Sequence, residues 1–544
     1  MRDTQITVSA QLPPSLRSAV NAKLEQSEQH NVSQRLEQHD ATLWGAPGTA
    51  EISNRLGWLD VGERMLAELD QLSGLSARLS EGMSDVALLG MGGSSLAVEV
   101  MRRTLSARPG APRLHVLDST DAQAIYALQA AIDPARTLFV VSSKSGGTIE
   151  PLSLFEHFYA EQGGGEKFVA ITDPQTPLAE LARQRGFAHT FLADPTIGGR
   201  YSALSHFGVA PAALAGLDIR AVLESSREAP DTPASHEGGE RPAGVWLGAT
   251  LSALAQAGRE KLTLVVCDAL ADFGLWLEQL VAESTGKRQT GILPVAQEPL
   301  GEAEIYGPDR VFAYLPDITA PAHGTHERVL ALARAGHPVI TIPTRGAGDL
   351  GRLFLLSELA VAVAGWGLSI NPFDQPNVAQ AKDATKRVLE RYEHDGELPR
   401  VPDAGEVELR ALLDAAPPSY VAIMGYLNPS AEFDAAVAEL RVALRELTGV
   451  AVTFGYGPRY LHSTGQYHKG GPRHGRFLQL LHDGPNDVQI PGHPYTFTTL
   501  KNAQAIGDLQ TLRELSLPAQ RLRLEGDDPA GALRRLTTQI KEML

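Results

Sequence analysis

Two turns rich in glycine and hydroxyl side chains carry the clearest chemical signal in the sequence. They lie in the segments LLGMGGSSLAVEV and VVSSKSGGTIEPL. Each turn follows an apolar run typical of a strand and precedes a helical pattern, so backbone N–H groups and the positive end of a helix would face one point. The hydroxyl groups and one lysine complete a cradle for a phosphate. The expected phosphate-binding residues are Gly92, Gly93, Ser94, Ser143, Lys144, Ser145 and Thr148.

The glycine spacing does not match a nucleotide site. Gly90 and Gly92 open the dinucleotide pattern G-x-G-x-x-G, but Ser95 stands where the third glycine is required. A G-x-x-x-x-G-K-[ST] loop is absent, which argues against an NTPase. One turn of this kind could equally be an ordinary tight connection between a strand and a helix, whereas two in one domain favour binding of a monophosphate.

Alternating strands and helices must position these turns. From Val86 onward, short apolar runs alternate with Gly/Ser turns and helical stretches, which predicts right-handed βαβ units and parallel sheets. Segments rich in Pro, Gly and charge, at 227–241 and 393–405, mark boundaries. We predict an α/β protein in which two doubly wound parallel-sheet sandwiches lie between an N-terminal helical segment without chemistry and a less regular C-terminal α/β block. The four parts are 1–80, 81–235, 236–395 and 396–544.

Composition excludes several classes of protein. The 544 residues include 48 basic and 64 acidic side chains, a formal net charge of −16 that disfavours binding to nucleic acid or to an anionic membrane. A single cysteine, Cys267, cannot form an internal disulfide or a thiolate-rich metal site. The longest uninterrupted apolar run, Leu359 to Leu368, is shorter than the roughly 18 residues of a spanning helix, and the N-terminus lacks an export pattern. We therefore expect a cytoplasmic protein.

Five strings resemble the successive signatures of the glucose-6-phosphate isomerase family. They are GMGGSS, SSKSGGT, IGGRYSALSHFG, WLEQLVAESTGK and NPFDQPNVAQAK. The resemblance covers about 80 to 382 and implies sugar-isomerase (SIS) domains, a homodimer, and conversion of glucose 6-phosphate to fructose 6-phosphate without metal or organic cofactor. The tail also resembles the isomerase half of bifunctional transaldolase/glucose-6-phosphate isomerases. Because no transaldolase half is present in this chain, only the isomerase activity is implied.

The expected reaction requires a base, a group that stabilises an oxyanion, and an acid that opens the sugar ring. Glu283, in AESTGK, is the expected base for proton transfer between C2 and C1. Arg200 follows two glycines, so its permanent charge could approach and stabilise an enediolate. By resemblance, Lys382 assists ring opening. Its spacing of seven residues from Gln375 would place both side chains on one side of a helix.

The ring-opening histidine departs from the usual order of motifs. In the family this histidine lies between the glutamate and the lysine, in a string resembling L-H-S-x-G-Q. Here that string contains His462 and follows Lys382. We favour His462 over His323 or His326, which keep the usual order but lie at a plain helix start. His462, His468 and His474 also raise the question of a metal, but their spacing is loose and H-E-x-x-H is absent, so no metal is expected.

Two rival functions remain open from the sequence. One is an SIS isomerase for another hexose phosphate, such as mannose 6-phosphate. The other is an SIS-type sensor that binds a sugar phosphate without turnover. A sensor would not need Glu283, Arg200 and Lys382 together, and no helix-turn-helix with a basic face is evident.

Overall fold

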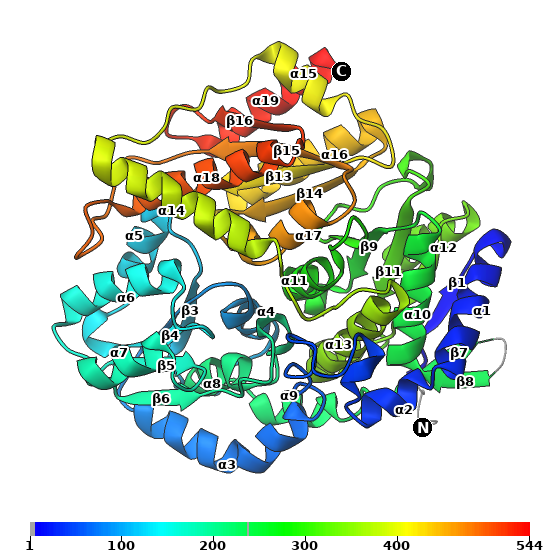
Figure 1. Cartoon of the computed structure of the whole chain (residues 1–544), viewed down its shortest axis with the longest axis horizontal. Coiled ribbons are helices and arrows are strands. Elements are labelled where there is room, and N and C mark those ends of the chain that lie inside the picture. Colours follow the sequence, from blue (N-terminus) through cyan, green and yellow to red (C-terminus); the bar gives the residue numbers. More distant parts are fainter. Residues whose placement is uncertain (1–5, 237–238) are drawn as a thin grey trace.

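The computed structural model describes residues 6–236 and 239–544, which form three α/β blocks (Figure 1). Residues 1–5, part of the N-terminal stretch in which no export pattern is seen, and residues 237–238 of the predicted boundary at 227–241 lie outside the described residues. The later part of that boundary contains two antiparallel strands, β7 (Pro233–His236) and β8 (Gly239–Pro242). The predicted α/β class is confirmed.

The first block contains a five-stranded, fully parallel sheet in the order β3-β2-β4-β5-β6. The strands are β2 (Asp85–Gly90), β3 (Arg113–Leu117), β4 (Thr137–Ser142), β5 (Phe168–Thr172) and β6 (His189–Leu192). The helices of this block are α4 (Leu96–Thr104), α5 (Ala122–Ala131), α6 (Ile149–Gln162), α7 (Pro177–Arg185), α8 (His206–Leu214) and α9 (Ile219–Ser226). Gly90 pairs with Ser142, so the two glycine-rich turns leave neighbouring strands side by side.

The second block contains a five-stranded sheet in the order β1-β12-β11-β9-β10. The strands are β1 (Ser9–Gln11), β9 (Lys261–Val266), β10 (Leu293–Val295), β11 (Arg310–Leu315) and β12 (Val339–Thr341). The helices are α10 (Ala243–Gln256), α11 (Phe273–Thr285), α12 (His323–Arg334) and α13 (Leu350–Gly367). Strand β1 runs antiparallel to β12 and lies within residues 1–80, the part of the chain predicted as an N-terminal helical segment. Three residues are too few to show the alternation by which a strand is recognised.

The rest of the N-terminal segment is helical, as predicted. It contains α1 (Pro14–Gln29), α2 (Val32–Glu37) and α3 (Val61–Leu79). Apolar residues of α1 and α3 join the largest core, which also includes residues of both five-stranded sheets. This segment therefore packs on both blocks.

The third block is more regular than predicted, because its four strands form a fully parallel sheet in the order β14-β13-β15-β16. The strands are β13 (Tyr420–Tyr426), β14 (Ala451–Tyr456), β15 (Gly475–Leu481) and β16 (Ala519–Arg523). The helices are α14 (Val378–Asp395), α15 (Glu406–Leu413), α16 (Ala431–Thr448), α17 (Gly465–Gly470), α18 (Phe497–Glu514) and α19 (Pro529–Met543). Helix α14 packs against α18, so it joins the second block to the third.

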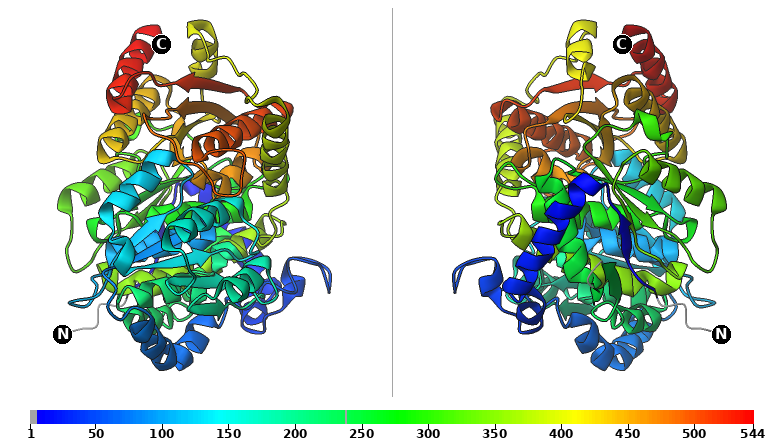
Figure 2. Two further views of the ribbon diagram at one scale, coloured as in Figure 1. Left: turned by 90° about the vertical axis from the view of Figure 1, so that its left-hand side faces the viewer. Right: turned by 90° about the vertical axis from the view of Figure 1, so that its right-hand side faces the viewer.

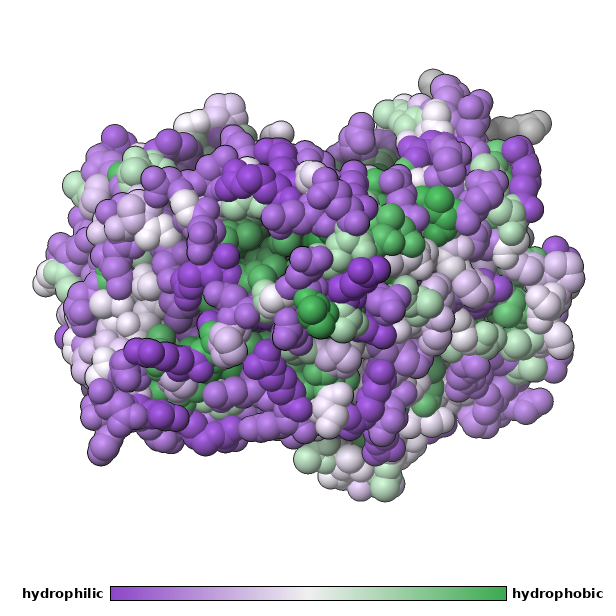
Figure 3. Space-filling model, turned by 90° about the horizontal axis from the view of Figure 1, so that it is seen from above, coloured by the Kyte–Doolittle hydropathy of each residue, from purple (hydrophilic) through white to green (hydrophobic). Residues whose placement is uncertain are grey.

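The side views place α3 and α19 at opposite ends of the molecule, with the third block stacked on the other two (Figure 2). One helical span among the described residues, Gly346–Gly367, is long and apolar enough to cross a membrane, but 89% of its window is buried inside the protein. It is therefore a core helix. The face over the third block is mainly hydrophilic, with scattered hydrophobic areas (Figure 3).

Candidate active site

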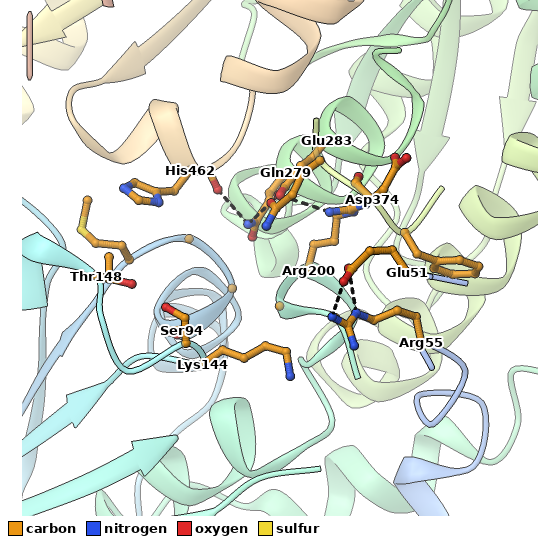
Figure 4. Close-up of a pocket in the computed structure, with 18 of the residues that line it drawn as sticks. Glu51, Arg55, Ser94, Lys144, Thr148, Arg200, Gln279, Glu283, Asp374 and His462 are labelled. Carbon is orange, nitrogen blue, oxygen red and sulfur yellow. Dashed lines mark hydrogen bonds and ion pairs between the residues drawn. The ribbon is translucent and has the colours of Figure 1, made fainter. Parts of the chain in front are cut away.

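A cavity of about 630 Å³ lies where the three blocks meet (Figure 4). Nearly all of the residues expected from the sequence line it. They are Gly92, Gly93, Ser94, Lys144, Ser145, Thr148, Arg200, Glu283, Lys382 and His462.

Close backbone contacts explain the glycines of the first turn. A Cβ atom on Gly93 would lie 2.1 Å from the carbonyl oxygen of Gly199, so only glycine allows the first turn to meet the segment that carries Arg200. Gly92 has φ +55°, and a Cβ there would lie 2.6 Å from the carbonyl oxygen of His462. The glycines thus bring three distant segments together at the cavity.

The second turn offers hydroxyl groups at the start of α6. Ser145 and Thr148 line the cavity with Ser94, and Thr148 immediately precedes the first turn of the helix. Ser143 is not among the lining residues. It is buried, and its hydroxyl is 2.9 Å from that of Thr148. Ser143 therefore holds Thr148 in place, and its own predicted contact with phosphate has no support from this geometry.

Lys144 lines the cavity as one half of an ion pair with Asp173. Its Nζ also donates to the carbonyl oxygen of Pro195 at 3.4 Å. Burial lowers the pKa of Lys144 and raises that of Asp173, because both charges lose water. A phosphate would compete with Asp173 for this ammonium group.

Glu283 is buried on α11 and is held at both carboxylate oxygens. Its Oε1 lies 3.1 Å from Nη1 of Arg200, and its Oε2 accepts a hydrogen bond of 3.0 Å from Nε2 of Gln279. The same amide nitrogen donates to the carbonyl oxygen of His462 at 2.8 Å. Gln279 and Glu283 are one helical turn apart and therefore face the same side. This arrangement fixes the carboxylate at the cavity wall.

The guanidinium group of Arg200 is equally fixed. Besides Glu283, it donates to Oγ of Ser284 at 2.8 Å and to the carbonyl oxygens of Pro372 and Asp374 at 2.6 and 2.9 Å. A permanent cation in this buried position can stabilise negative charge that develops on a bound molecule.

Lys287 anchors the loop that supplies these carbonyl groups. Its Nζ donates to the carbonyl oxygen of Asn371 at 2.6 Å and pairs with Oδ1 of Asp374 at 2.7 Å. Burial, reinforced by the charge of Arg200, lowers the pKa of Lys287 to about 7. This lysine was not predicted to have a role, although it ends the string WLEQLVAESTGK.

Lys382 lines the cavity from α14 with an exposed side chain. The predicted helical relation to Gln375 is wrong, because α14 begins at Val378 and Gln375 lies in the irregular segment before it. Both residues nevertheless line the cavity.

His462 faces the cavity from the third block, and its ring is paired with a buried glutamate. Nε2 of His462 lies 2.8 Å from Oε1 of Glu150, which also accepts a hydrogen bond of 2.7 Å from Nε2 of Gln504. Burial alone would raise the pKa of Glu150, but the adjacent His462 outweighs this and the pKa is lowered. The sequence analysis did not predict Glu150 as a site residue. Its position, two residues after Thr148 of the second turn, was the one signal available.

The other histidines lie elsewhere. His468 is buried against Tyr420 at 3.0 Å, and burial lowers its pKa to about 3. His474 lies 3.6 Å from Glu260, and His323 and His326 are exposed on α12. Within residues 6–236 and 239–544, no group of three or more His, Cys, Asp or Glu side chains could hold a metal ion.

Comparison with known proteins identifies the family. The phosphoglucose isomerase family model matches residues 67–298. Glucose-6-phosphate isomerase of Rubrobacter xylanophilus is 31% identical over 360 residues, which cover 56% of this chain and 82% of that protein. The chain belongs to the glucose-6-phosphate isomerase family. A second family member, from Carboxydothermus hydrogenoformans, is 28% identical over 384 residues, which cover 60% of this chain and 82% of that protein.

Solved structures support the fold. A hypothetical protein of Thermus thermophilus has a TM-score of 0.56 and 24% identity, covering 69% of this chain and 97% of that one. A glucose-6-phosphate isomerase of Chlamydia trachomatis has a TM-score of 0.52 and 18% identity, covering 70% and 86%. These two structures confirm the fold, whereas the predicted family is confirmed by the sequence relatives. The closer likeness to bifunctional enzymes stays a prediction. Lys382 and His462 lie outside the matched residues 67–298.

Proposed function

We propose that Glu283, Arg200, Lys382 and His462 carry out the interconversion of glucose 6-phosphate and fructose 6-phosphate, the reaction for which this enzyme family is named. The observation that supports the proposal most strongly is their convergence on one cavity with the two phosphate-binding turns. No single sequence segment contains all of them, and a protein that only bound the sugar phosphate would not need a base paired with an arginine.

Binding and ring opening come first in the proposed reaction. The phosphate binds at the two turns, beside Ser94, Ser145 and Thr148, where helix α6 begins. His462 then passes a proton to or from the ring oxygens, with Lys382 on the same cavity wall. The carboxylate of Glu150, 2.8 Å from Nε2, orients the imidazole for this transfer.

Proton transfer follows on the open-chain sugar. The carboxylate of Glu283 removes the proton from C2, the electron pair forms the C1–C2 double bond, and the negative charge moves onto O1. Arg200, 3.1 Å from Glu283, stabilises this enediolate. A proton moves from O2 to O1, and Glu283 returns its proton to C1, which leaves the carbonyl group at C2.

A homodimer remains part of the proposal, as the family resemblance implies. His462 lines the cavity of its own chain, so the proposed chemistry does not require a histidine from a second subunit. Analytical ultracentrifugation under assay conditions tests the association, and a fully active monomer would contradict it.

A coupled assay with fructose 6-phosphate in chelator-treated buffer tests the proposed function. We expect glucose 6-phosphate to form at an undiminished rate, because each proposed step uses side chains of this chain. Mannose 6-phosphate as the product would favour the alternative isomerase, and binding without turnover would favour a sensor. Loss of activity in chelator, with recovery on addition of a divalent metal, would contradict the proposed chemistry.

A further inference from the structure

The N-terminal segment contributes two charged side chains to the cavity wall, although the sequence predicted no chemistry there. Glu51 and Arg55 lie across the cavity from His462 and Thr148 (Figure 4). Nε and Nη2 of Arg55 donate to the two carboxylate oxygens of Glu51 at 3.0 and 2.8 Å. This two-pronged pair fixes the carboxylate more firmly than a single contact would.

Buried neighbours hold this segment in place. Ile52, Leu56 and Trp58 belong to the main core, and the ring of Trp58 packs on Tyr201 with centroids 4.9 Å apart. Tyr201 directly follows Arg200. The position of Glu51 is therefore coupled to the same rigid part of the site that positions Arg200.

The backbone at Glu51 is unusual. Its φ is +59°, in the left-handed region that costs a residue with a Cβ about 1 kcal/mol or more. The carbonyl oxygen of Glu51 accepts a hydrogen bond of 3.4 Å from Asn371, in the loop that also contacts Arg200. The surrounding structure thus maintains a strained conformation whose result is a carboxylate at the cavity.

The hydrogen bonds of Glu51 and Arg55 show which of the two side chains is still able to bind a ligand. Four of the five N–H donors of Arg55 are used, on Glu51, on Asn54 and on the carbonyl oxygen of Pro195 at 3.1 Å. The Glu51 carboxylate has about four acceptor sites, and Arg55 occupies two. Its side chain is 44% exposed, against 16% for Arg55. Glu51 therefore has unused acceptor capacity at the cavity wall, while nearly all donors of Arg55 are used.

We propose that Glu51 is a substrate-binding residue whose carboxylate accepts hydrogen bonds from hydroxyl groups of the sugar, and that Arg55 is its positioning residue. The identity of the sugar phosphate rests on the proposed function. A carboxylate repels a phosphate and attracts hydroxyl donors, so Glu51 suits hydroxyl groups of the sugar. Arg55 lies beside Lys144, since both donate to the carbonyl oxygen of Pro195, at 3.1 and 3.4 Å, so Glu51 would receive hydroxyl groups close to the phosphate turns.

The test compares a ligand that has hydroxyl groups with one that lacks them. We expect Glu51→Ala to raise KM for fructose 6-phosphate about tenfold with kcat nearly unchanged, since a charge-assisted hydrogen bond common to ground and transition states is lost. The competitive inhibition constant of inorganic phosphate should stay within about twofold of wild type or fall. Glu63→Ala, an exposed glutamate on α3, is the control and should match wild type.

Two results would overturn the proposal. An unchanged KM in Glu51→Ala would show that the carboxylate does not contact the sugar. A rise of the phosphate inhibition constant in parallel with KM would show that the segment only supports the structure of the site. Arg55→Lys should raise KM less than Glu51→Ala does and should leave inhibition by phosphate unchanged. If KM of Arg55→Lys equals that of wild type, Arg55 does not position Glu51. Calorimetric titration of fructose 6-phosphate into wild type and into Glu51→Ala measures the contact without turnover. If wild type shows no turnover, the proposed function is refuted, but a weaker affinity in Glu51→Ala would still support the contact.

Discussion

Replacing Glu150 by glutamine removes one negative charge beside His462 and nearly preserves the size of the side chain. The two groups are 2.8 Å apart, and the side chain of Glu150 is only 4% exposed, so solvent screens their attraction weakly. Unit charges about 4 Å apart interact by about 4 kcal/mol at an effective dielectric constant of about 20. The amide oxygen can still accept a hydrogen bond from His462, which retains part of this energy. We expect turnover of cyclic glucose 6-phosphate to fall about a hundredfold in Glu150→Gln, which corresponds to about 3 kcal/mol.

The assay separates ring opening from proton transfer. 5-Deoxyfructose 6-phosphate cannot close a ring through O5, so the enzyme meets it in open-chain form. Exchange of its C1 proton with deuterated solvent, followed by NMR, should change less than about threefold in Glu150→Gln and in His462→Asn, because the affected step is bypassed. Glu156→Gln, further along α6, is the control and should match wild type on both substrates.

An equal loss on both substrates would refute this reasoning, because it would place His462 and Glu150 in the proton transfer itself. A selective loss in His323→Asn or His326→Asn, with His462→Asn active, would show that the usual order of motifs is the better guide.

Three further results are expected. Lys144→Ala should raise KM for the sugar phosphate about tenfold with little change in kcat, whereas Lys167→Ala should not, as steady-state kinetics will show. Gln279→Leu should lower kcat about tenfold through loss of the hydrogen bond to Glu283, with less effect on KM. Burial lowers the pKa of Lys287 from 10.5 to about 7. Between these pH values the unfolded chain therefore binds more protons than the folded chain. This group thus makes the free energy of unfolding rise with pH from about 7 to 10.5. Urea unfolding of Lys287→Met should lack this rise, and an equal rise in both proteins would contradict the lowered pKa.

The sequence predicted the parallel sheets well because their strands are buried on both sides and form continuous apolar runs. The run from Asp85 to Gly90 is buried throughout and is followed at once by the glycine turn. The three-residue strands at Ser9–Gln11 and Leu293–Val295 were missed, since pairing with a neighbouring strand defines them and local pattern does not.

Site residues were predicted where they belong to a distinctive sequence motif. They were missed where only the tertiary fold brings them to the cavity. Arg200 and Glu283 are marked by their motifs, and the structure adds their ion pair. Glu51, Arg55 and Glu150 reach the cavity from segments that look like an ordinary turn or an ordinary helix start. The role of these residues depends on their tertiary contacts across the cavity, and local sequence spacing contains no information on such contacts.

The central claim is that Glu283 transfers the proton between C2 and C1. Its most direct test is Glu283→Gln, in which exchange of the fructose 6-phosphate C1 proton with deuterated solvent is measured together with affinity for the substrate. Loss of a general base is expected to slow exchange about a hundred- to ten-thousand-fold, while the nearly isosteric amide keeps the dissociation constant within about threefold. Exchange at the wild-type rate in this variant would contradict the claim and remove Glu283 from the reaction.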